Sequence, residues 1–461
     1  MNKSSNIVYY GLAVLSLKGI SLIMMPIVTR YLSVSDYGML NFLVSIASML
    51  SIILSFGLSE LLYRFNDFED KKRQHIFYKA CLKIALFSAG ICLTTSVFLV
   101  DFVMSVLPTQ VSTKALSFLF INLGGSVVLS LPLAILRIHG EAKKYMLVAV
   151  SQGVLQAICT VLLLELGMGV DGVMLSGAIV VWLLLALLAF RYKTLLLTKL
   201  DSENVLTKEH SYYIFSITLA SVFSYGLNGA ENWFLVSFEG KETLAVYFIA
   251  TQFALVASIA FEPFRLWWFP QRFNIYKSNQ QKAADIPLYG LAYALVIVIT
   301  MMTVGPYVID LLLPKAYEVS KNILPWLCVV FFIKTVSELL NLGCYYKNNA
   351  SAAPVINGIS ACLAVVLTYV SLKHFDLYTM LYALILVHAI RALLFLRISQ
   401  SLVSLSYKYK YLILMFALLM AQTLLVSHHN EIAIIFFIVG TFLVLSFTIY
   451  QRKQLLLRLR G

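Results

Sequence analysis

Fourteen apolar stretches, each about long enough to cross a bilayer, follow one another along this chain of 461 residues. A hydrocarbon core of about 30 Å needs roughly 20 apolar residues per helix. Because 60% of the residues are hydrophobic and only 12% are charged, the chain supplies these helices almost without interruption. We therefore predict an all-α polytopic membrane protein. The predicted spans are Val8–Leu32, Leu40–Leu62, Phe77–Val100, Ala115–Leu136, Met146–Leu166, Gly172–Phe190, Tyr212–Phe238, Leu244–Phe269, Leu288–Leu313, Ile323–Tyr346, Pro354–Leu372, Tyr378–Leu396, Tyr411–Ser427 and Glu431–Tyr450.

Basic residues crowd into every second connection between these spans. The two termini and the even-numbered connections carry twenty-five Lys and Arg residues, whereas the odd-numbered connections carry six. Lys and Arg are retained on the cytoplasmic side of a membrane. We therefore expect a multi-pass protein of the bacterial inner (plasma) membrane with both termini in the cytoplasm.

Composition argues against several other classes of protein. The net charge of +13 is explained by this topology, so we expect no nucleic-acid partner. The six cysteines all fall within spans without metal-ligand spacing, and we expect no metal site. The first apolar run is too long for a signal peptide and lacks a cleavage site, so it reads as the first helix.

Charge and motif spacing divide the chain into repeats. A polar linker at Asp201–His210 separates the first twelve spans into six plus six. Lys143 follows Gly38 by 105 positions, and Lys347 follows Ala245 by 102, at equivalent places in the two halves. Six is an even number, so both halves start from the cytoplasm, and their pseudo-twofold axis must lie along the membrane normal. We predict six-helix bundles at residues 1–199 and 211–400, a cytoplasmic linker at 200–210, and two additional helices with a basic tail at 401–461.

Short motifs in both halves resemble a known family. The motifs are Thr29-Arg30-Tyr31-Leu32 with Asp36-Tyr37-Gly38, Phe56-Gly57-Leu58-Ser59-Glu60 with Arg64-Phe65, Leu311-Leu312-Leu313-Pro314-Lys315-Ala316-Tyr317, Ile323-Leu324-Pro325, Lys347 and Asn357. Together they are similar to the polysaccharide (Wzx-type, O-antigen) flippases of the multidrug/oligosaccharidyl-lipid/polysaccharide (MOP) exporter superfamily. The chain departs from the family pattern in having Ala245 for Gly and Glu231 for Asp. The resemblance implies two six-helix bundles in a V around a central cavity, and flipping of undecaprenyl-diphosphate-linked oligosaccharide to the outer leaflet by alternating access.

Cations inside the spans are the candidates for contact with a diphosphate. A charge at membrane depth costs about 2.5 to more than 10 kcal/mol and normally faces a wet cavity or a partner. These residues are Lys18, Lys83, Lys334 and Arg391. For each, a simpler account stays open: a buried ion pair for Lys18, snorkelling to the interface for Lys83 and Arg391, and a pair with Glu338 on the same helix face for Lys334.

Carboxylates inside the spans are the candidates for ion coupling. A carboxylate desolvated in a bundle can gain and lose protons near neutrality. The candidates are Glu231, Glu60, Glu262 and Glu338, with H⁺ or Na⁺ as the coupling ion and no other cofactor. Structural pairing with Arg64 or Arg265 is the alternative for Glu60 and Glu262, and Asp310 is expected to be solvated.

The sequence contains no phosphate-binding loop, so the chain is not expected to hydrolyse ATP. Short outer loops argue against a membrane-embedded polymerase or ligase, and we expect no enzyme and no catalytic residues. Two alternatives to the oligosaccharide flippase stay open: a flippase for lipid II of peptidoglycan synthesis, and a cation-coupled multidrug exporter. Expected partners are the lipid-linked oligosaccharide, membrane lipids and polysaccharide polymerase or assembly proteins.

Overall fold

The computed structural model describes residues 3–66, 71–191, 206–346 and 352–427, together with part of 432–441. The described residues form helices and connecting turns, with no strand among them. The helices are α1 (Lys3–Tyr31), α2 (Val34–Leu54), α3 (Leu58–Arg64), α4 (Lys71–Thr94), a π-helical turn (Thr95–Leu99), α5 (Val100–Val106), α6 (Thr113–Ile138), α7 (Ala142–Glu165), α8 (Gly169–Arg191), α10 (Lys208–Asn228), α11 (Glu231–Phe238), α12 (Gly240–Ser278), α13 (Gln280–Leu312), a 3₁₀ turn (Lys315–Tyr317), α14 (Ser320–Leu339), α15 (Leu342–Tyr345), α16 (Ala352–His374), α17 (Leu377–Leu402) and α18 (Tyr409–Ser427).

Twelve helical segments in the described part of the chain are long and apolar enough to cross a membrane, and each overlaps a predicted span. The span predicted at Tyr212–Phe238 is instead divided, because α10 ends at Asn228 and α11 begins at Glu231. Asn and Gly are poor helix formers, and Asn228-Gly229 stands at the division. Most of the last predicted span, residues 200–205 of the predicted linker, Lys347 and the basic tail lie outside the described residues. The end of the predicted linker is described, and α10 begins there at Lys208.

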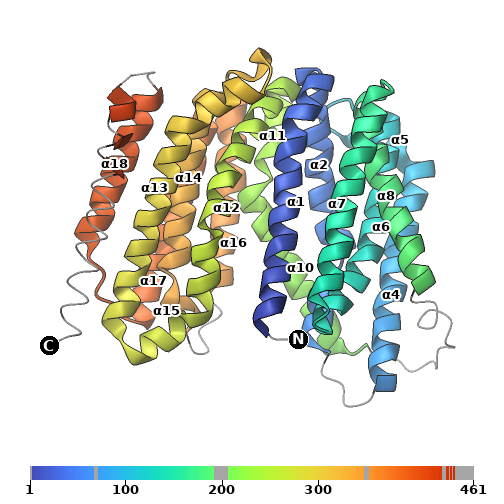
Figure 1. The fold of residues 1–461 in the computed structure, drawn as a ribbon, viewed down its shortest axis with the longest axis horizontal. Coiled ribbons are helices and arrows are strands. Elements are labelled where there is room, and N and C mark those ends of the chain that lie inside the picture. Colours follow the sequence, from blue (N-terminus) through green and yellow to red (C-terminus); the bar gives the residue numbers. More distant parts are fainter. Residues whose placement is uncertain are drawn as a thin grey trace. The chain divides into compact units, whose positions relative to one another are not determined.

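The helices gather into two compact units. Unit 1 comprises Met1–Tyr225 and Gly240–Ala245, and unit 2 comprises Gly226–Glu239 and Val246–Gly461. In unit 1, α6 packs against α4 and α8, while α7 packs against α1 and α8 (Figure 1). Buried apolar side chains of α3, α4 and α6, among them Leu61, Phe77 and Val127, form one core of this unit. Most of α10 belongs to unit 1, although the sequence assigns it to the second bundle.

Unit 2 is built around α14, which packs against α13, α17 and α18. The α18 helix lies beside α13 at the edge of this unit (Figure 1). The amide of Gln422 on α18 is buried and donates a hydrogen bond of 2.9 Å to Thr303 Oγ1 on α13. The first of the two additional helices is therefore attached to unit 2 by a polar contact as well as by packing.

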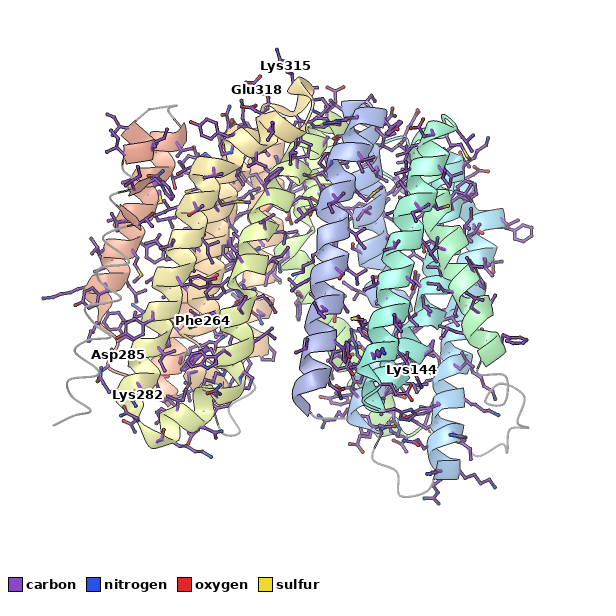
Figure 2. The ribbon with its side chains drawn as sticks, viewed as in Figure 1. Lys144, Phe264, Lys282, Asp285, Lys315 and Glu318 are labelled. Atoms are coloured by element: carbon purple, nitrogen blue, oxygen red, sulfur yellow. The ribbon has the colours of Figure 1, made fainter. Side chains whose placement is uncertain are left out.

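Charged side chains mark the two ends of unit 2. Lys315 and Glu318 lie at one end, and Lys282 and Asp285 lie at the other (Figure 2). The helices between these ends carry the apolar side chains that a bilayer core requires. Unit 2 therefore has the profile of a membrane-spanning bundle.

Each unit contains a glycine where two segments touch through their backbones. A Cβ added at Gly38 would lie 1.9 Å from the carbonyl oxygen of Lys241, within unit 1. A Cβ added at Gly343 would lie 2.1 Å from the carbonyl oxygen of Ser399, within unit 2. Only glycine allows these approaches.

Candidate functional site

Five helices of unit 2 bring a set of charged and polar side chains together. We call this set the unit-2 network. Its helices are α11, α12, α14, α16 and α17. Its members are Glu231, Tyr247, Glu262, Arg265, Lys334, Glu338, Asn357, His388 and Arg391. Five of the eight predicted site residues belong to this network. The network consists of an acidic end around Arg265, a cationic pole, and Glu231.

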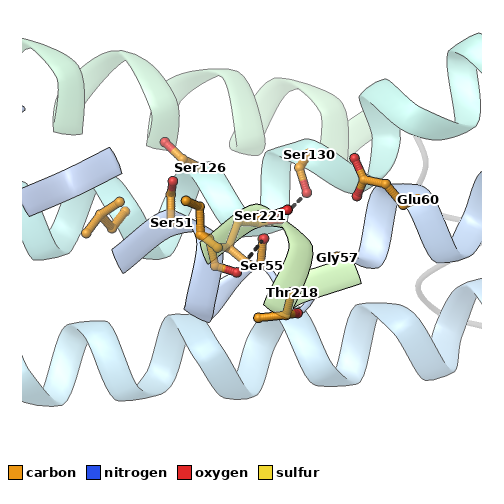
Figure 3. A pocket seen from close by; sticks show the side chains of 11 residues that line it. Ser51, Ser55, Gly57, Glu60, Ser126, Ser130, Thr218 and Ser221 are labelled. Carbon is orange, nitrogen blue, oxygen red and sulfur yellow. Dashed lines mark hydrogen bonds between the residues drawn. The ribbon is translucent and has the colours of Figure 1, made fainter. Parts of the chain in front are cut away.

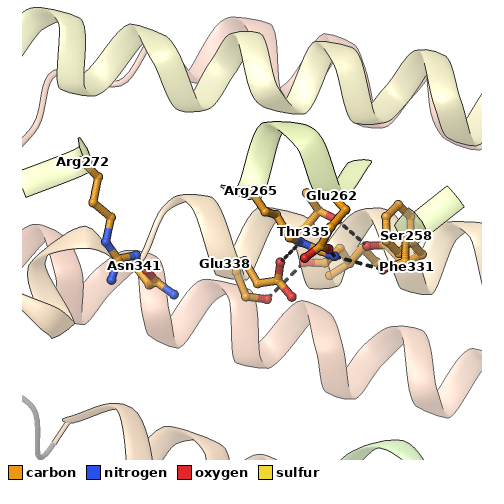
Figure 4. A network of polar contacts seen from close by, with 10 residues as sticks. Ser258, Glu262, Arg265, Arg272, Phe331, Thr335, Glu338 and Asn341 are labelled. Carbon is orange, nitrogen blue, oxygen red and sulfur yellow. Dashed lines mark hydrogen bonds and ion pairs between the residues drawn. The ribbon is translucent and has the colours of Figure 1, made fainter. Parts of the chain in front are cut away.

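Arg265 organises the acidic end of the network (Figure 4). Its Nε lies 2.9 Å from Glu338 Oε2, and its Nη1 lies 3.2 Å from Glu262 Oε2. The same Nη1 donates to Ser258 Oγ at 2.9 Å. One guanidinium thus holds two carboxylates and joins α12 to α14. The predicted pair of Glu262 with Arg265 is confirmed.

Lys334 lies one helical turn before Glu338 on α14 but does not pair with it. Glu338 reaches across to Arg265 instead, so the predicted pairing of Lys334 with Glu338 is wrong. Lys334 is half-buried and lies within electrostatic range of Glu231, Arg391 and Glu338. Among the described residues, no side chain or carbonyl forms a hydrogen bond or ion pair with its ammonium.

Arg391 lies near Lys334 and also lacks a carboxylate partner in the described part of the chain. Its Nε donates to Asn357 Oδ1 on α16 at 2.9 Å, and its guanidinium lies 5.2 Å from the centre of the Phe395 ring. An amide and an aromatic face orient this guanidinium without neutralising it. Lys334 and Arg391 therefore form a cationic pole within the helices of unit 2.

His388 lies one turn before Arg391 on α17 and within electrostatic range of both cations. Its side chain is buried, with 1% of its surface exposed. Neither ring nitrogen has a hydrogen-bond partner among the described residues. A buried imidazole is normally hydrogen-bonded, so these two nitrogens are unsatisfied polar atoms beside the cationic pole.

Glu231 opens α11, directly after the division from α10. The hydroxyl of Tyr247 donates to Glu231 Oε1 at 3.2 Å. Glu231 also lies within electrostatic range of Lys334, so this carboxylate connects the helix break to the cationic pole. Of the four predicted carboxylates, Glu231 is the one that interacts with Lys334 without being held by Arg265.

The remaining predicted residues lie in unit 1. Lys18 is half-buried on α1, and among the described residues no hydrogen bond or ion pair holds it; Lys83 is exposed on α4. Glu60 is exposed in the first turn of α3 and lines a polar pocket (Figure 3). It does not pair with Arg64, whose guanidinium lies 5.1 Å from the centre of the Tyr213 ring. The structure does not bring these three residues into one cluster.

One expectation about an acid differs from the structure. Asp310 is not simply solvated, since Lys321 Nζ lies 2.8 Å from its Oδ1. Sequence reasoning also missed Tyr247 and Asn357 as partners of Glu231 and Arg391. Each of these two residues is polar within an apolar span, which the sequence shows. Each one's partner lies on another helix, which the sequence does not show.

Comparisons with known proteins agree with this architecture. The family model described as "Polysaccharide biosynthesis protein" matches residues 4–275. A structure titled lipid II flippase MurJ, inward closed conformation, has a TM-score of 0.69 at 13% identity and covers 97% of this chain and 100% of that chain. A MATE structure in complex with MaL6 has a TM-score of 0.58 at 14% identity, covering 86% and 96%. A MOP superfamily transporter from Pyrococcus furiosus has a TM-score of 0.55 at 15% identity, covering 86% and 95%. No curated protein matches the chain.

Proposed function

The chain belongs to the polysaccharide biosynthesis protein family, and we propose that it is a flippase for a lipid-linked oligosaccharide. Its substrate is an undecaprenyl diphosphate that carries a repeat unit of O-antigen or of another surface polysaccharide. The protein moves this lipid from the inner to the outer leaflet of the bacterial inner membrane by alternating access. Its fold, shared with transporters and a flippase at low identity, supports a transport role.

The observation that carries the proposal is the cationic pole of Lys334 and Arg391. Neither cation has a carboxylate within ion-pair distance in the described part of the chain, although both lie in candidate membrane spans. A cation at membrane depth costs at least about 2.5 kcal/mol, and Glu231 and Glu338, which act on these cations electrostatically, form no ion pair with either. A diphosphate is a ligand that offsets this cost, because guanidinium and ammonium groups form strong hydrogen bonds with phosphate oxygens.

His388 strengthens the case for an anion at this pole. Its unpartnered ring nitrogens lie beside Lys334 and Arg391, and an imidazole N–H can donate to a phosphate oxygen. Asn357 and Phe395 hold the Arg391 guanidinium without supplying a negative charge. The group that completes this arrangement is therefore an acceptor with negative charge.

Glu231 couples the binding of a cation to the binding of the substrate during the transport cycle. Its carboxylate and the substrate diphosphate compete for Lys334, so a cation that occupies or protonates Glu231 frees Lys334 for the substrate. Release of that cation restores the attraction between Glu231 and Lys334 and weakens substrate binding by the same factor, as linkage requires. The coupling ion is H⁺ or Na⁺. Glu338 instead serves to join α14 to α12 through Arg265, which also pairs with Glu262 on its own helix.

The chemistry of the cationic pole supports an anionic substrate over a cationic one. A multidrug exporter that carries organic cations would gain nothing from unpaired Lys334 and Arg391. A lipid II flippase would use the same pole, because lipid II also carries a diphosphate. The two flippase functions are separated by asking whether the gene sustains surface polysaccharide or peptidoglycan synthesis.

The test replaces the two cations in cells that depend on this gene for surface polysaccharide. We expect Lys334→Ala and Arg391→Ala each to reduce surface polysaccharide at least about tenfold, since each removes a charge-assisted contact of about 1.5–3 kcal/mol. Lys373→Ala is the matched control, because Lys373 is exposed at the end of α16. Unchanged polysaccharide in both variants, at wild-type protein levels, would reject the proposal.

A further inference from the structure

A polar pocket within unit 1 is distinct from the unit-2 network. It has a volume of about 260 Å³ and is lined by α2, α3, α6 and α10 together with the turn between α2 and α3 (Figure 3). Seven of its side chains are polar, and none is a Lys or Arg. These seven are Ser51, Ser55, Glu60, Ser126, Ser130, Thr218 and Ser221. Such a wall has no means of attracting a diphosphate.

The five serine hydroxyls of this pocket already donate hydrogen bonds within the protein. Each donates to an oxygen of its own helix, as serine in a helix commonly does. The bonds are Ser51 to the carbonyl of Ser48, Ser55 to that of Ile52, Ser130 to that of Val127, Ser221 to that of Ile217, and Ser126 to Asn122 Oδ1. A hydroxyl that donates in this way keeps its lone pairs as acceptors. The pocket therefore presents a ring of acceptor oxygens.

Two further groups complete this acceptor wall. An ionised carboxylate such as Glu60 accepts hydrogen bonds only. Thr218 Oγ1 is buried and has no hydrogen-bond partner in the described part of the chain. A buried hydroxyl without a partner is rare in a folded protein. The pocket is therefore complementary to a ligand with several hydrogen-bond donors and no negative charge.

The backbone at the pocket is shaped by a broken helix. Phe56 and Gly57, between α2 and α3, have φ of 48° and 57°, in the left-handed region. A Cβ at Gly57 would lie 2.2 Å from Ile217 Cγ2, so only glycine lets α10 approach here and bring Thr218 to the wall. Interrupted membrane helices commonly form substrate sites in transporters.

The spacing and the volume of the pocket decide between a metal cation and an organic ligand with several hydrogen-bond donors. A bare metal cation needs its oxygen ligands at about 2–2.6 Å around one point, whereas this pocket spreads its oxygens over four helices. Its volume is about nine times the roughly 30 Å³ that a water molecule occupies in the liquid. A single sugar ring fills such a space and offers several hydroxyl donors at once.

We propose that the unit-1 pocket binds one sugar ring of the lipid-linked saccharide through these acceptor oxygens. The inference rests on the proposed function for the source of the sugar. It concerns the saccharide alone, and every residue that lines the pocket belongs to unit 1. Ser126 and Ser130, one turn apart on α6, and Thr218 on α10 accept hydroxyl protons of the ring, and Glu60 accepts from a further hydroxyl or from an amino group.

The experiment compares two lipids on purified protein in detergent: undecaprenyl diphosphate, and the same lipid bearing one N-acetylglucosamine. We expect Ser126→Ala combined with Ser130→Ala to weaken binding of the sugar-bearing lipid about tenfold, because two acceptors of about 0.5–1.5 kcal/mol each are lost. Binding of the sugar-free lipid stays unchanged, which also shows that the variant is folded. Thr218→Val is expected to act in the same direction.

Ser48→Ala combined with Ser216→Ala is the matched control. Both serines lie on pocket-forming helices and donate to their own helix backbone at 2.9 Å, but neither lines the pocket. Unchanged affinity for the sugar-bearing lipid in the pocket variant would overturn the inference. So would loss, in that variant, of ²²Na⁺ binding measured without lipid, since the pocket would then be a cation site.

Failure of the proposed function gives a different result from failure of the pocket proposal. If wild-type protein bound neither lipid, the flippase proposal would fail, and free N-acetylglucosamine would then test the pocket directly. Binding of the free sugar that the pocket variant loses would still support the pocket, and absence of such binding would overturn it.

Discussion

Units 1 and 2 are both bundles of apolar helices, but the polar pocket of unit 1 and the unit-2 network differ in chemistry. Unit 1 has a pocket of hydroxyl oxygens with one carboxylate and no cation. Unit 2 has a network in which Arg265 satisfies two carboxylates while Lys334 and Arg391 have none of their own among the described residues. Two bundles of apolar helices in one chain therefore need not carry the same kind of polar site: hydroxyl oxygens suit a ligand rich in hydrogen-bond donors, whereas cations suit an anion.

The largest expected effect tests whether both units depend on a glycine at which two backbone segments touch. Gly343→Ala in unit 2 places a Cβ against the backbone of Ser399, and we expect a loss of about 3 kcal/mol, at the upper end of typical overpacking costs. Gly38→Ala should cost a similar amount in unit 1. Thermal unfolding in detergent measures both. Gly90→Ala, where nothing lies within 4 Å, is the control; an equal loss there would remove the packing explanation.

The next effect concerns the acidic end of the unit-2 network. Arg265→Ala leaves Glu262 and Glu338 without their cation, and we expect the free energy of unfolding to fall by about 2 kcal/mol. This is less than the roughly 3–5 kcal/mol of a fully buried pair, because the two carboxylates are each 36% exposed. Urea unfolding monitored by tryptophan fluorescence measures the change. Glu262→Gln combined with Glu338→Gln should restore part of the stability to the Arg265→Ala protein; no restoration would show that Arg265 acts through packing alone.

A smaller effect compares a charged helix cap in unit 2 with a neutral one in unit 1. Asp376 caps α17 by accepting from the Thr379 N–H at 2.9 Å, and this bond together with the Thr379 hydroxyl lowers the pKa of Asp376. Ser112 caps α6 through a neutral hydroxyl. Asp376→Ala should cost about 1 kcal/mol at pH 7.

The sign of the pH dependence follows from the lowered pKa. A carboxyl whose pKa is lower in the folded state stabilises the fold above its unfolded pKa, and this contribution is lost as the pH falls through the folded value. The difference in stability between wild type and Asp376→Ala should therefore shrink as acid is added, whereas that for Ser112→Ala should not change through the cap itself. A difference for Asp376→Ala that stayed constant with pH would contradict this assignment.

The smallest expected effect concerns Lys83 of unit 1. This side chain is exposed and lies away from the pocket-lining residues. Lys83→Ala should change the free energy of unfolding by less than about 0.5 kcal/mol, as surface substitutions usually do, and should leave surface polysaccharide within twofold of wild type. A large loss of polysaccharide with normal protein levels would place a required cation in unit 1 and break the contrast between the units.

Much of the fold could be predicted because bilayer thickness fixes the length of an apolar helix. Asn228-Gly229 is one place that shows the limit, since the hydropathy of Tyr212–Phe238 does not reveal that α10 and the short α11 replace one span. The candidate residues could be listed from charge inside the spans, but their partners could not. Glu338 is paired through space to Arg265, 73 positions away, rather than to Lys334 on its own helix. The pocket could not be predicted for a related reason. Its hydroxyl residues lie in three separate pairs along the chain, on α2, α6 and α10, and only folding brings these pairs together.

The most direct test of the central claim measures diphosphate recognition by unit 2. Purified wild-type protein and the Lys334→Gln, Arg391→Gln double variant are titrated with undecaprenyl diphosphate and with undecaprenol, which shares the chain but lacks the phosphates. We predict that the double variant binds the diphosphate at least about tenfold more weakly, as expected for lost charge-assisted hydrogen bonds, while undecaprenol binding is unchanged. Equal affinity of the wild type and the double variant for undecaprenyl diphosphate would contradict the account.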